Sequence, residues 1–381
     1  MSDWQKIIAP YLNNIEEHFD RIKLQLHDRL GDQDPMMILP YRGYGNTNKI
    51  NLKGRVLENK VLTPPPSSAD NLWDNLLNMY RRYESDKIPY AQVLARFAGS
   101  ARIVKADSEG FFEARIEPIQ SFPPDRLWHP VQLKLINPRS DGVSQAQAVG
   151  EVLIPPSTAR FGVISDIDDT VAITDTQHLL NMMRTVFLGN ARARLPIKGV
   201  PAFFRALHAG SQGHEFNPIF YVSSSPWNLY DLFSDFFTLN AIPAGPILLR
   251  NWGISEKEIS PLENREHKLN IIRQVIRMYP NLPFILIGDS GQEDPEIYCE
   301  LVSQYPGHIL AIYIRDISQN DNRSTAIQHL TEQVKAAGCD LVLTASTLFM
   351  AAHATQHAWI SSNSLPEIRA QVREVFPEIS K

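Results

Sequence analysis

After residue 160 the chain alternates short, almost wholly apolar segments with segments of helical periodicity, and this alternation limits the folds open to it. In chain order the strand candidates are RFGVIS, NPIFYVS, GPILLR, PFILIG, HILAIYIR and DLVLTA. Strands that are apolar on both faces are typical of parallel sheets with helices packed on each side. We therefore predict an α/β domain over 158–381, built on a doubly wound parallel sheet whose active site lies beyond the carboxyl ends of the strands.

The sequence before residue 158 has a different pattern. Runs such as INLKGRVLEN, YAQVLARFAG, GFFEARI and QAVGEVLIP are rich in strand-forming residues and are separated by turn residues. They predict a β-sandwich-like domain over 36–157, interrupted by a helical stretch near 71–85. Residues 1–35 have apolar side chains at helical spacing, which predicts an amphipathic helix. A chain of 381 residues is long enough for such a division.

Composition and charge argue against several classes of protein. The formal net charge of −5 is unlike the basic excess of a general nucleic-acid binder. Two cysteines, Cys299 and Cys339, are too few for a disulfide framework and fit a reducing compartment. We see no apolar signal-peptide core and no window near the roughly 20 apolar residues of a membrane span. We therefore expect a cytoplasmic protein, which would reach any lipid substrate from the water side as a peripheral membrane protein.

Three aspartates directly follow the first apolar strand of the α/β region. Asp166, Asp168 and Asp169 lie in the string VISDIDDTVAIT. Carboxylates crowded at a buried strand end repel one another, so a cation or hydrogen-bond donors must compensate their charge. Mg²⁺ prefers such hard oxygen ligands. The alternative is a polar turn in which Asp169 or Thr170 caps the next helix.

Further polar residues occur at positions that a parallel sheet would bring close to these aspartates. The second strand ends in Ser223–Ser225, where a hydroxyl can hydrogen-bond a phosphoryl oxygen. Lys268 begins a helical segment, and its ammonium can neutralise a phosphoryl group in transfer. The fourth strand ends in Gly288 and Asp289, with Asp294 five residues later. Each feature alone is common in ordinary turns and surface helices, so the stronger indication is their order along one sheet.

This order of motifs resembles the haloacid dehalogenase-like (HAD) phosphohydrolase superfamily across about 160–345. The strings DIDDTV, YVSSSPWNLY, FILIGDSGQEDPEIY and IYIRD also resemble the catalytic-domain family of the yeast actin-patch phosphatidate phosphatase. Strings similar to PYRGYG, LKGRV and DSEGFF occur in the β-rich N-terminal half of bacterial relatives. The resemblance implies a HAD-like (Rossmannoid) catalytic domain with a small cap or flap. It also suggests a transthyretin-like N-terminal domain, by fold analogy.

The resemblance implies specific roles in catalysis. Asp166 would be the nucleophile that becomes an aspartyl-phosphate. Asp168 would protonate the leaving alkoxide and then activate the hydrolytic water. Thr170 would steady the loop. Ser223 would hold a phosphoryl oxygen, with Ser224, one position later, as the alternative.

The same resemblance implies how charge is balanced. Lys268 would neutralise the nucleophile and the phosphate. The implied Mg²⁺ ligands are three carboxylates and one backbone carbonyl, namely Asp166, Asp289, Asp294 and the Asp168 carbonyl. Glu293 is the rival to Asp294, and the sequence leaves both open.

The flap, at about 174–199, is the segment most informative about substrate. No aspartate or glutamate occurs from Thr176 to His214, whereas the same stretch contains Arg184, Arg192 and Arg194. In one interpretation these arginines bind an anionic headgroup while an apolar helical face meets acyl chains or an anionic membrane surface. In the other, the segment is a core-packing helix followed by a solvated basic loop.

Three functions follow from these observations. We predict a Mg²⁺-dependent phosphomonoester hydrolase that acts on phosphatidate or a related lipid phosphate and releases diacylglycerol and phosphate. The first alternative is the same chemistry on a soluble phosphoester. The second is a non-enzymatic interaction module with a degenerate phosphatase fold, against which the intact set of acids and lysine argues.

Overall fold

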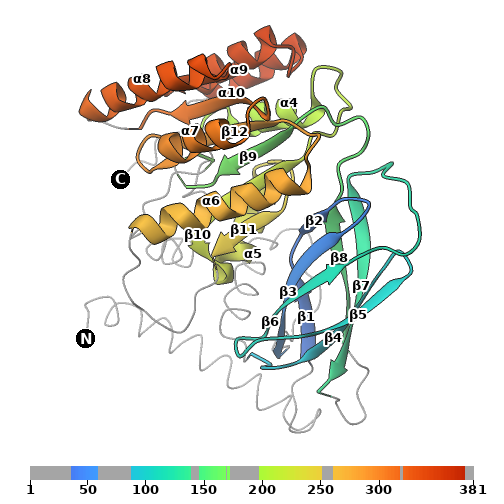
Figure 1. The fold of residues 1–381 in the computed structure, drawn as a ribbon. Helices are drawn as coiled ribbons and strands as arrows, with labels where there is room; N and C mark the ends of the chain where they lie inside the picture. The colour runs from blue at the N-terminus through green and yellow to red at the C-terminus, as the bar shows by residue number, and fades with distance from the viewer. Residues whose placement is uncertain are drawn as a thin grey trace, which may run out of the picture.

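The structure is a computed structural model that describes seven stretches of the chain: 36–58, 87–138, 146–168, 170–171, 197–250, 261–317 and 321–373. The predicted helices at 1–35 and 71–85 lie outside the described residues, and so do Asp169 and most of the predicted flap, with its three arginines. Figure 1 shows a curled β layer beside a second part in which helices cover a sheet. Among the described residues, no helix is both long and apolar enough to cross a bilayer.

The N-terminal part is one mixed sheet of eight strands. Its strands are β1 (Met36–Pro40), β2 (Gly43–Gly45), β3 (Ile50–Glu58), β4 (Gln92–Phe97), β5 (Ser100–Lys105), β6 (Phe111–Ile116), β7 (Trp128–Asn137) and β8 (Gln147–Leu153). The order is β1-β3-β2-β8-β7-β4-β5, with β6 paired to β3. All pairs are antiparallel except β2 with β8.

Period-two burial explains why these segments form strands. In β7, for example, alternate side chains are buried, with Val131, Leu133 and Leu135 pointing inward and polar neighbours outward. The inward residues of five other strands join them in one apolar core. The prediction of a β-rich N-terminal part is thus met, while its likeness to a sandwich or to transthyretin stays a prediction.

The second part is built on a six-stranded sheet in which every pairing is parallel. Its strands are β9 (Gly162–Asp166), β10 (Ile219–Pro226), β11 (Ile247–Arg250), β12 (Phe284–Asp289), β13 (Ile309–Arg315) and β14 (Asp340–Thr344). Their order is β11-β10-β9-β12-β13-β14, so the direction of winding reverses between β9 and β12. Ligands bind beyond the carboxyl ends of the strands at such a reversal.

Helices pack on both faces of this sheet, as Figure 1 shows. One face carries α4 (Val200–Ala209), α5 (Tyr230–Leu239), α9 (Thr347–Gln356) and α10 (Leu365–Arg373), and the other carries α6 (Pro261–Met278), α7 (Asp294–Gln304) and α8 (Asp321–Ala336). Alternate residues of the strands belong to the two apolar cores; in β10, Tyr221 packs on the first face and Phe220 on the second. The prediction of an α/β part with a parallel sheet is confirmed.

The two parts pack directly against each other. The ring of Tyr41 stacks on that of Trp227, with 5.2 Å between centroids, and Trp227 follows the end of β10. The backbone N–H of Arg42 donates to the hydroxyl of Tyr230 on α5, at 2.7 Å. The side-chain amide of Asn46 donates to the carbonyl of Met278 at the end of α6, at 3.0 Å. The N-terminal sheet therefore lies beside the helices that flank the candidate site.

Candidate active site

The carboxyl ends of two adjacent parallel strands bring two aspartates together. Asp166 is the last residue of β9 and Asp289 is the last residue of β12. Both strands are apolar on each face, so both ends lie deep in the molecule, and Asp166 and Asp289 are 1% and 0% exposed. Asp294, at the start of α7, is also fully buried. One oxygen from each of these three carboxylates lies within 4.8 Å of the other two.

A buried lysine bridges two members of this cluster. The ammonium of Lys268, on α6, lies 2.7 Å from Asp166 Oδ1 and also contacts Asp294 Oδ1. Burial lowers the pKa of Lys268, but the charges of the two carboxylates outweigh it and raise the pKa above its ordinary value. Lys268 is therefore a fixed positive charge beside Asp166.

The loop between β12 and α7 brings Asp294 rather than Glu293 into the cluster. Asp294 Oδ2 accepts a hydrogen bond from the backbone N–H of Asp289, at 3.3 Å, whereas Glu293 is exposed. This approach requires a glycine, because a Cβ at Gly288 would lie 2.3 Å from Asp294 Oδ2. Both oxygens of Asp294 thus have protein partners. Its geometry suits holding Lys268 at least as well as binding a metal.

Two buried carboxylate oxygens have no hydrogen-bond partner among the described residues, namely Asp166 Oδ2 and Asp289 Oδ2. The other oxygen of Asp289 accepts the backbone N–H groups of Gly291 (2.7 Å) and Gln292 (3.1 Å), which fixes the orientation of this carboxylate. Leaving such atoms unpaired in a buried site is costly. Carboxylate oxygens are ligands of hard divalent cations, so the acidic cluster fits a metal ion.

Burial and mutual repulsion raise the pKa values of Asp166 and Asp289. Burial raises the pKa of Asp166 well above its ordinary value, and Lys268 lowers it without cancelling the rise. Burial, followed by the charge of Asp294, raises the pKa of Asp289 to about 7. In the absence of a cation, the cluster therefore favours holding protons, which is a second reason why a divalent cation fits it.

Asp168 and Ser223 form a hydrogen-bonded pair at the same edge. The hydroxyl of Ser223, on β10, donates to Asp168 Oδ2 at 2.8 Å and accepts from the backbone N–H of Ser225 at 3.0 Å. Ser224 is half-buried beside it. The hydroxyl of Thr170 is buried without a hydrogen-bond partner among the described residues. All the predicted site residues within the described ranges thus lie at this edge of the sheet or in the segments that follow it.

The sequence interpretation assigned no role to Arg315. It ends β13, directly opposite Asp289 in the strand register, and is 5% exposed. Its guanidinium donates to the carbonyl of Ala345 (3.0 Å) and the hydroxyl of Thr347 (3.1 Å), while its Nε has no partner among the described residues. Burial lowers its pKa to about 10, against an opposing effect of Asp289. The sequence signal for a role of Arg315 is its position, because it is the charged residue that ends the apolar string ILAIYIR.

The sequence interpretation also did not find a basic cleft between the two parts of the structure. It measures about 900 Å³ and lies between α6 and strands β2, β3 and β6 of the N-terminal sheet. Seven of its lining residues are lysine or arginine and two are glutamate, an excess of five positive charges in a chain of net charge −5. These residues are spread from Arg42 to Arg277, so no local sequence pattern reveals them.

One end of the cleft reaches the edge of the sheet that carries the acidic cluster. His267 and Arg250 line that end; the first precedes Lys268 and the second ends β11. Neighbouring strands are about 4.8 Å apart, so β11 lies roughly 10 Å from the strand of Asp166. Burial, followed by the charges of Arg250 and Lys53, lowers the pKa of His267 to about 4. Burial is the larger cause of this shift, and the two cations of the cleft act in the same direction.

Two curated proteins match this chain over part of its length. Phosphatidate phosphatase APP1 of Saccharomyces cerevisiae is 35% identical over 161 residues, which is 42% of this chain and 26% of that protein. Uncharacterized protein C29B5.04c of Schizosaccharomyces pombe is 34% identical over 161 residues, 41% of this chain and 25% of that protein. The chain thus spans about a quarter of the length of these curated relatives.

Solved structures add no information on the fold. A carbohydrate acetylesterase from Xanthomonas citri matches 86% of this chain and 71% of its own, at 11% identity and a TM-score of 0.27.

The family model described as "Phosphatidate phosphatase APP1, catalytic domain" matches residues 161–316, and this range contains every residue of the acidic cluster together with Lys268 and Ser223. The stretch that forms the candidate active site is therefore similar to the catalytic domain of phosphatidate phosphatases.

Proposed function

We propose that this protein is a HAD-like, Mg²⁺-dependent phosphatase that hydrolyses phosphatidate or a related lipid phosphate, with Asp166 as nucleophile. The observation that carries the proposal is the buried cluster of Asp166, Lys268, Asp289 and Asp294, located within the range that matches the phosphatidate phosphatase family. The two curated relatives each match this chain over 161 residues. Phosphoryl transfer requires mainly positioning and charge neutralisation, and the cluster supplies groups for both.

The first step is assigned to Asp166. Lys268 holds one oxygen of its carboxylate, so the orientation of the nucleophile is set before the substrate binds. A bond forms between an Asp166 oxygen and phosphorus while the bond to the leaving alkoxide breaks. Mg²⁺ held by Asp166, Asp289 and the Asp168 carbonyl would neutralise the phosphoryl oxygens and keep Asp166 ionised. Asp294 holds Lys268 and supports this arrangement.

The proton transfers are assigned to Asp168. It gives a proton to the leaving alkoxide and later takes one from the water that attacks the aspartyl-phosphate, which regenerates Asp166 and releases phosphate. Ser223 donates to Asp168 and so sets its position. The same hydroxyl lies at the carboxyl end of β10 and is our candidate for binding a phosphoryl oxygen. It has one proton to donate, so it would turn from Asp168 to the phosphoryl oxygen when substrate binds. Ser224 is the alternative. Thr170, whose hydroxyl is unpartnered, is assigned to the support of this loop.

The test of this function is release of phosphate from vesicles that contain phosphatidate, measured with Mg²⁺ and compared with a panel of soluble phosphoesters. We expect release to depend on Mg²⁺, to stop with excess chelator and to return when Mg²⁺ is added. Full activity in chelator would remove the metal from the mechanism. Faster hydrolysis of soluble esters than of vesicle phosphatidate would contradict the lipid substrate and leave the phosphatase chemistry in place.

One observation favours a soluble phosphoester as the second candidate. The walls of the basic cleft carry many charged and amide side chains, and the apolar acyl chains of a lipid need a broader apolar surface than such walls offer. The predicted flap, with Arg184, Arg192 and Arg194, lies outside the described residues, and its contact with an anionic membrane remains a proposal. The two substrate classes are separated by the vesicle comparison above.

A charge reversal in the cleft should weaken capture of any phosphate-bearing substrate. We expect Arg250→Glu to lower kcat/KM by about tenfold at low ionic strength, because a cleft lined by one sign of charge concentrates ions of the other sign. Salt screens this field, so the difference from wild type should shrink as ionic strength rises. Lys335→Glu, an equal change of charge at an exposed site on α8, is the matched control. Equal losses in both variants would show that only net charge matters.

A further inference from the structure

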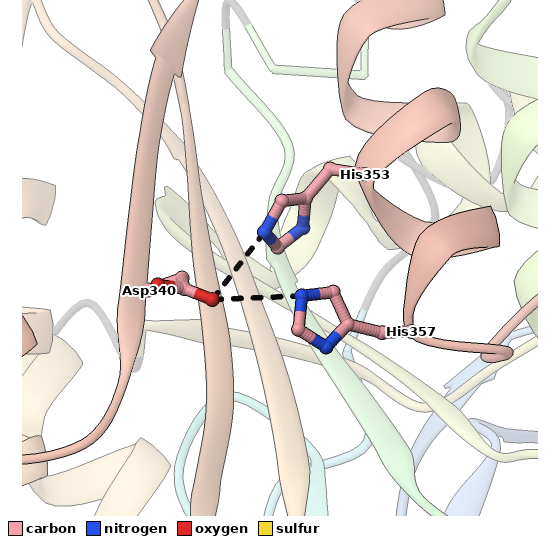
Figure 2. A group of neighbouring side chains, drawn as sticks. All are labelled: Asp340, His353 and His357. Atoms are coloured by element: carbon pink, nitrogen blue, oxygen red, sulfur yellow. Dashed lines mark ion pairs between the residues drawn. The ribbon is translucent and has the colours of Figure 1, made fainter.

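A second group of metal-ligating side chains lies far from the acidic cluster. Asp340 is the first residue of β14, the outermost strand of the parallel sheet. His353 is on α9 and His357 follows one helical turn later, at the end of that helix. Figure 2 shows both imidazoles directed at the Asp340 carboxylate. This group lies at the amino end of its strand, whereas the acidic cluster lies at the carboxyl ends of the neighbouring strands.

The distances in this group are those of ligands around a shared metal ion. The Nε2 atoms of His353 and His357 lie 3.4 Å and 3.6 Å from the same oxygen, Asp340 Oδ2. Both distances exceed the 2.7–3.2 Å that is typical of N–H···O hydrogen bonds. Tetrahedral zinc has ligand bonds of about 2.0–2.1 Å, which places neighbouring ligand atoms roughly 3.3–3.4 Å apart. The spacing thus fits a shared zinc ion better than it fits direct hydrogen bonds.

Neighbouring side chains hold both rings in this orientation. His353 Nδ1 is hydrogen-bonded to the hydroxyl of Tyr313, at 3.0 Å, which directs Nε2 toward Asp340. A partner on the second ring nitrogen is the usual arrangement for a metal-bound histidine. The ring of His357 stacks on that of Trp359, with 4.6 Å between centroids. Neither imidazole needs to turn for a metal to bind.

A simple ion-pair network explains the group less well. If both imidazoles were protonated to pair with Asp340, two positive rings would lie with centroids 4.5 Å apart and share a single carboxylate oxygen. Like charges at that separation repel each other. Neutral imidazoles around a cation avoid this repulsion, and each then offers a lone pair.

We propose that Asp340, His353 and His357 bind one Zn²⁺, with water as the remaining ligand at this partly exposed site. Imidazole nitrogen suits zinc and its neighbours among the transition metals, whereas Mg²⁺ prefers oxygen ligands. The two sites therefore select different metals. The zinc joins the end of α9 to the edge strand β14, and so it stabilises the C-terminal part of the α/β fold. It takes no part in the chemistry at Asp166.

The test is calorimetric titration of the full chain with Zn²⁺ in the presence of saturating Mg²⁺, which under the proposed function fills the acidic cluster. We expect one Zn²⁺ per wild-type chain. We expect His357→Ala, and separately Asp340→Asn, to weaken that binding by about tenfold or more. His329→Ala is the matched control, because it removes an exposed imidazole from α8, outside the group. Asp340→Asn preserves the shape of the side chain, which keeps the test valid if the alanine variant fails to fold.

Two further measurements are independent of enzymatic activity. Zn²⁺ should raise the melting temperature of the wild type and of His329→Ala by similar amounts, and that of His357→Ala by clearly less. Co²⁺ bound in place of zinc should give visible absorption bands in the wild type that are absent in Asp340→Asn. The proposal is overturned if the wild type binds no Zn²⁺ when Mg²⁺ is saturating, or if the His357 and Asp340 variants bind it as tightly as the control does.

Discussion

Asp166→Asn should abolish phosphate release, by on the order of 10⁴-fold or more, and leave the protein folded. The amide is a poor nucleophile and carries no charge for Lys268 or a metal to bind. The fold should survive because the change removes one negative charge from a crowded acidic site in which burial raises the pKa of this residue. The measurements are phosphate release with Mg²⁺ and the circular dichroism spectrum. Asp125→Asn, at an exposed position of the N-terminal part, is the matched control.

Near-normal turnover by Asp166→Asn would refute the assigned nucleophile. Asp168→Asn is a second variant, and it tests the general-acid role. If Asp168 is the general acid, its loss should slow alkyl phosphates more than phenyl phosphates, because a phenolate leaves without protonation. Equal losses for both classes would exclude that role and leave the assignment of Asp166 in place.

The location of the acidic cluster could be predicted from sequence because it depends on local signals. A strand that is apolar on both faces must be central in a parallel sheet, and the polar residue that ends it must lie at the carboxyl edge. That reasoning predicts the positions of Asp166 and Asp289 from the sequence alone. The choice between Asp294 and Glu293 could not be made this way, because the path of the Ser290–Glu293 loop decides which side chain turns inward.

Other features depend on contacts between distant segments, so no local sequence pattern predicts them. The basic cleft exists only because the N-terminal sheet packs beside α6, and its cations are separated by more than two hundred residues. The order of strands in the N-terminal sheet, including the parallel pair of β2 and β8, is likewise a matter of long-range pairing. Helix α8 was not predicted from the sequence. Few of its residues are fully buried, among them Ile327 and Val334, so the apolar periodicity that would indicate a helix is weak.

Asp289→Asn should make the metal-free protein more stable while it removes activity. Burial and the charge of Asp294 raise the pKa of Asp289 from an ordinary value of 3.8 to about 7. Between these two values the folded state binds more protons than the unfolded state, so the free energy of unfolding falls as pH rises from about 4 to about 7. An asparagine at this position does not ionise, yet its oxygen can still accept the N–H groups of Gly291 and Gln292.

The variant should therefore lose this pH dependence. In chelator at pH 8 we expect it to be more stable than the wild type by roughly 2–4 kcal/mol, measured by urea denaturation. Mg²⁺ should reverse the order, because a cation that binds only the folded wild type adds to its free energy of unfolding. The opposite result is equally informative. If the variant is the less stable protein in chelator at pH 8, then the backbone N–H groups and Arg315 already satisfy the Asp289 carboxylate, and the case for a metal at this strand end fails on energetic grounds.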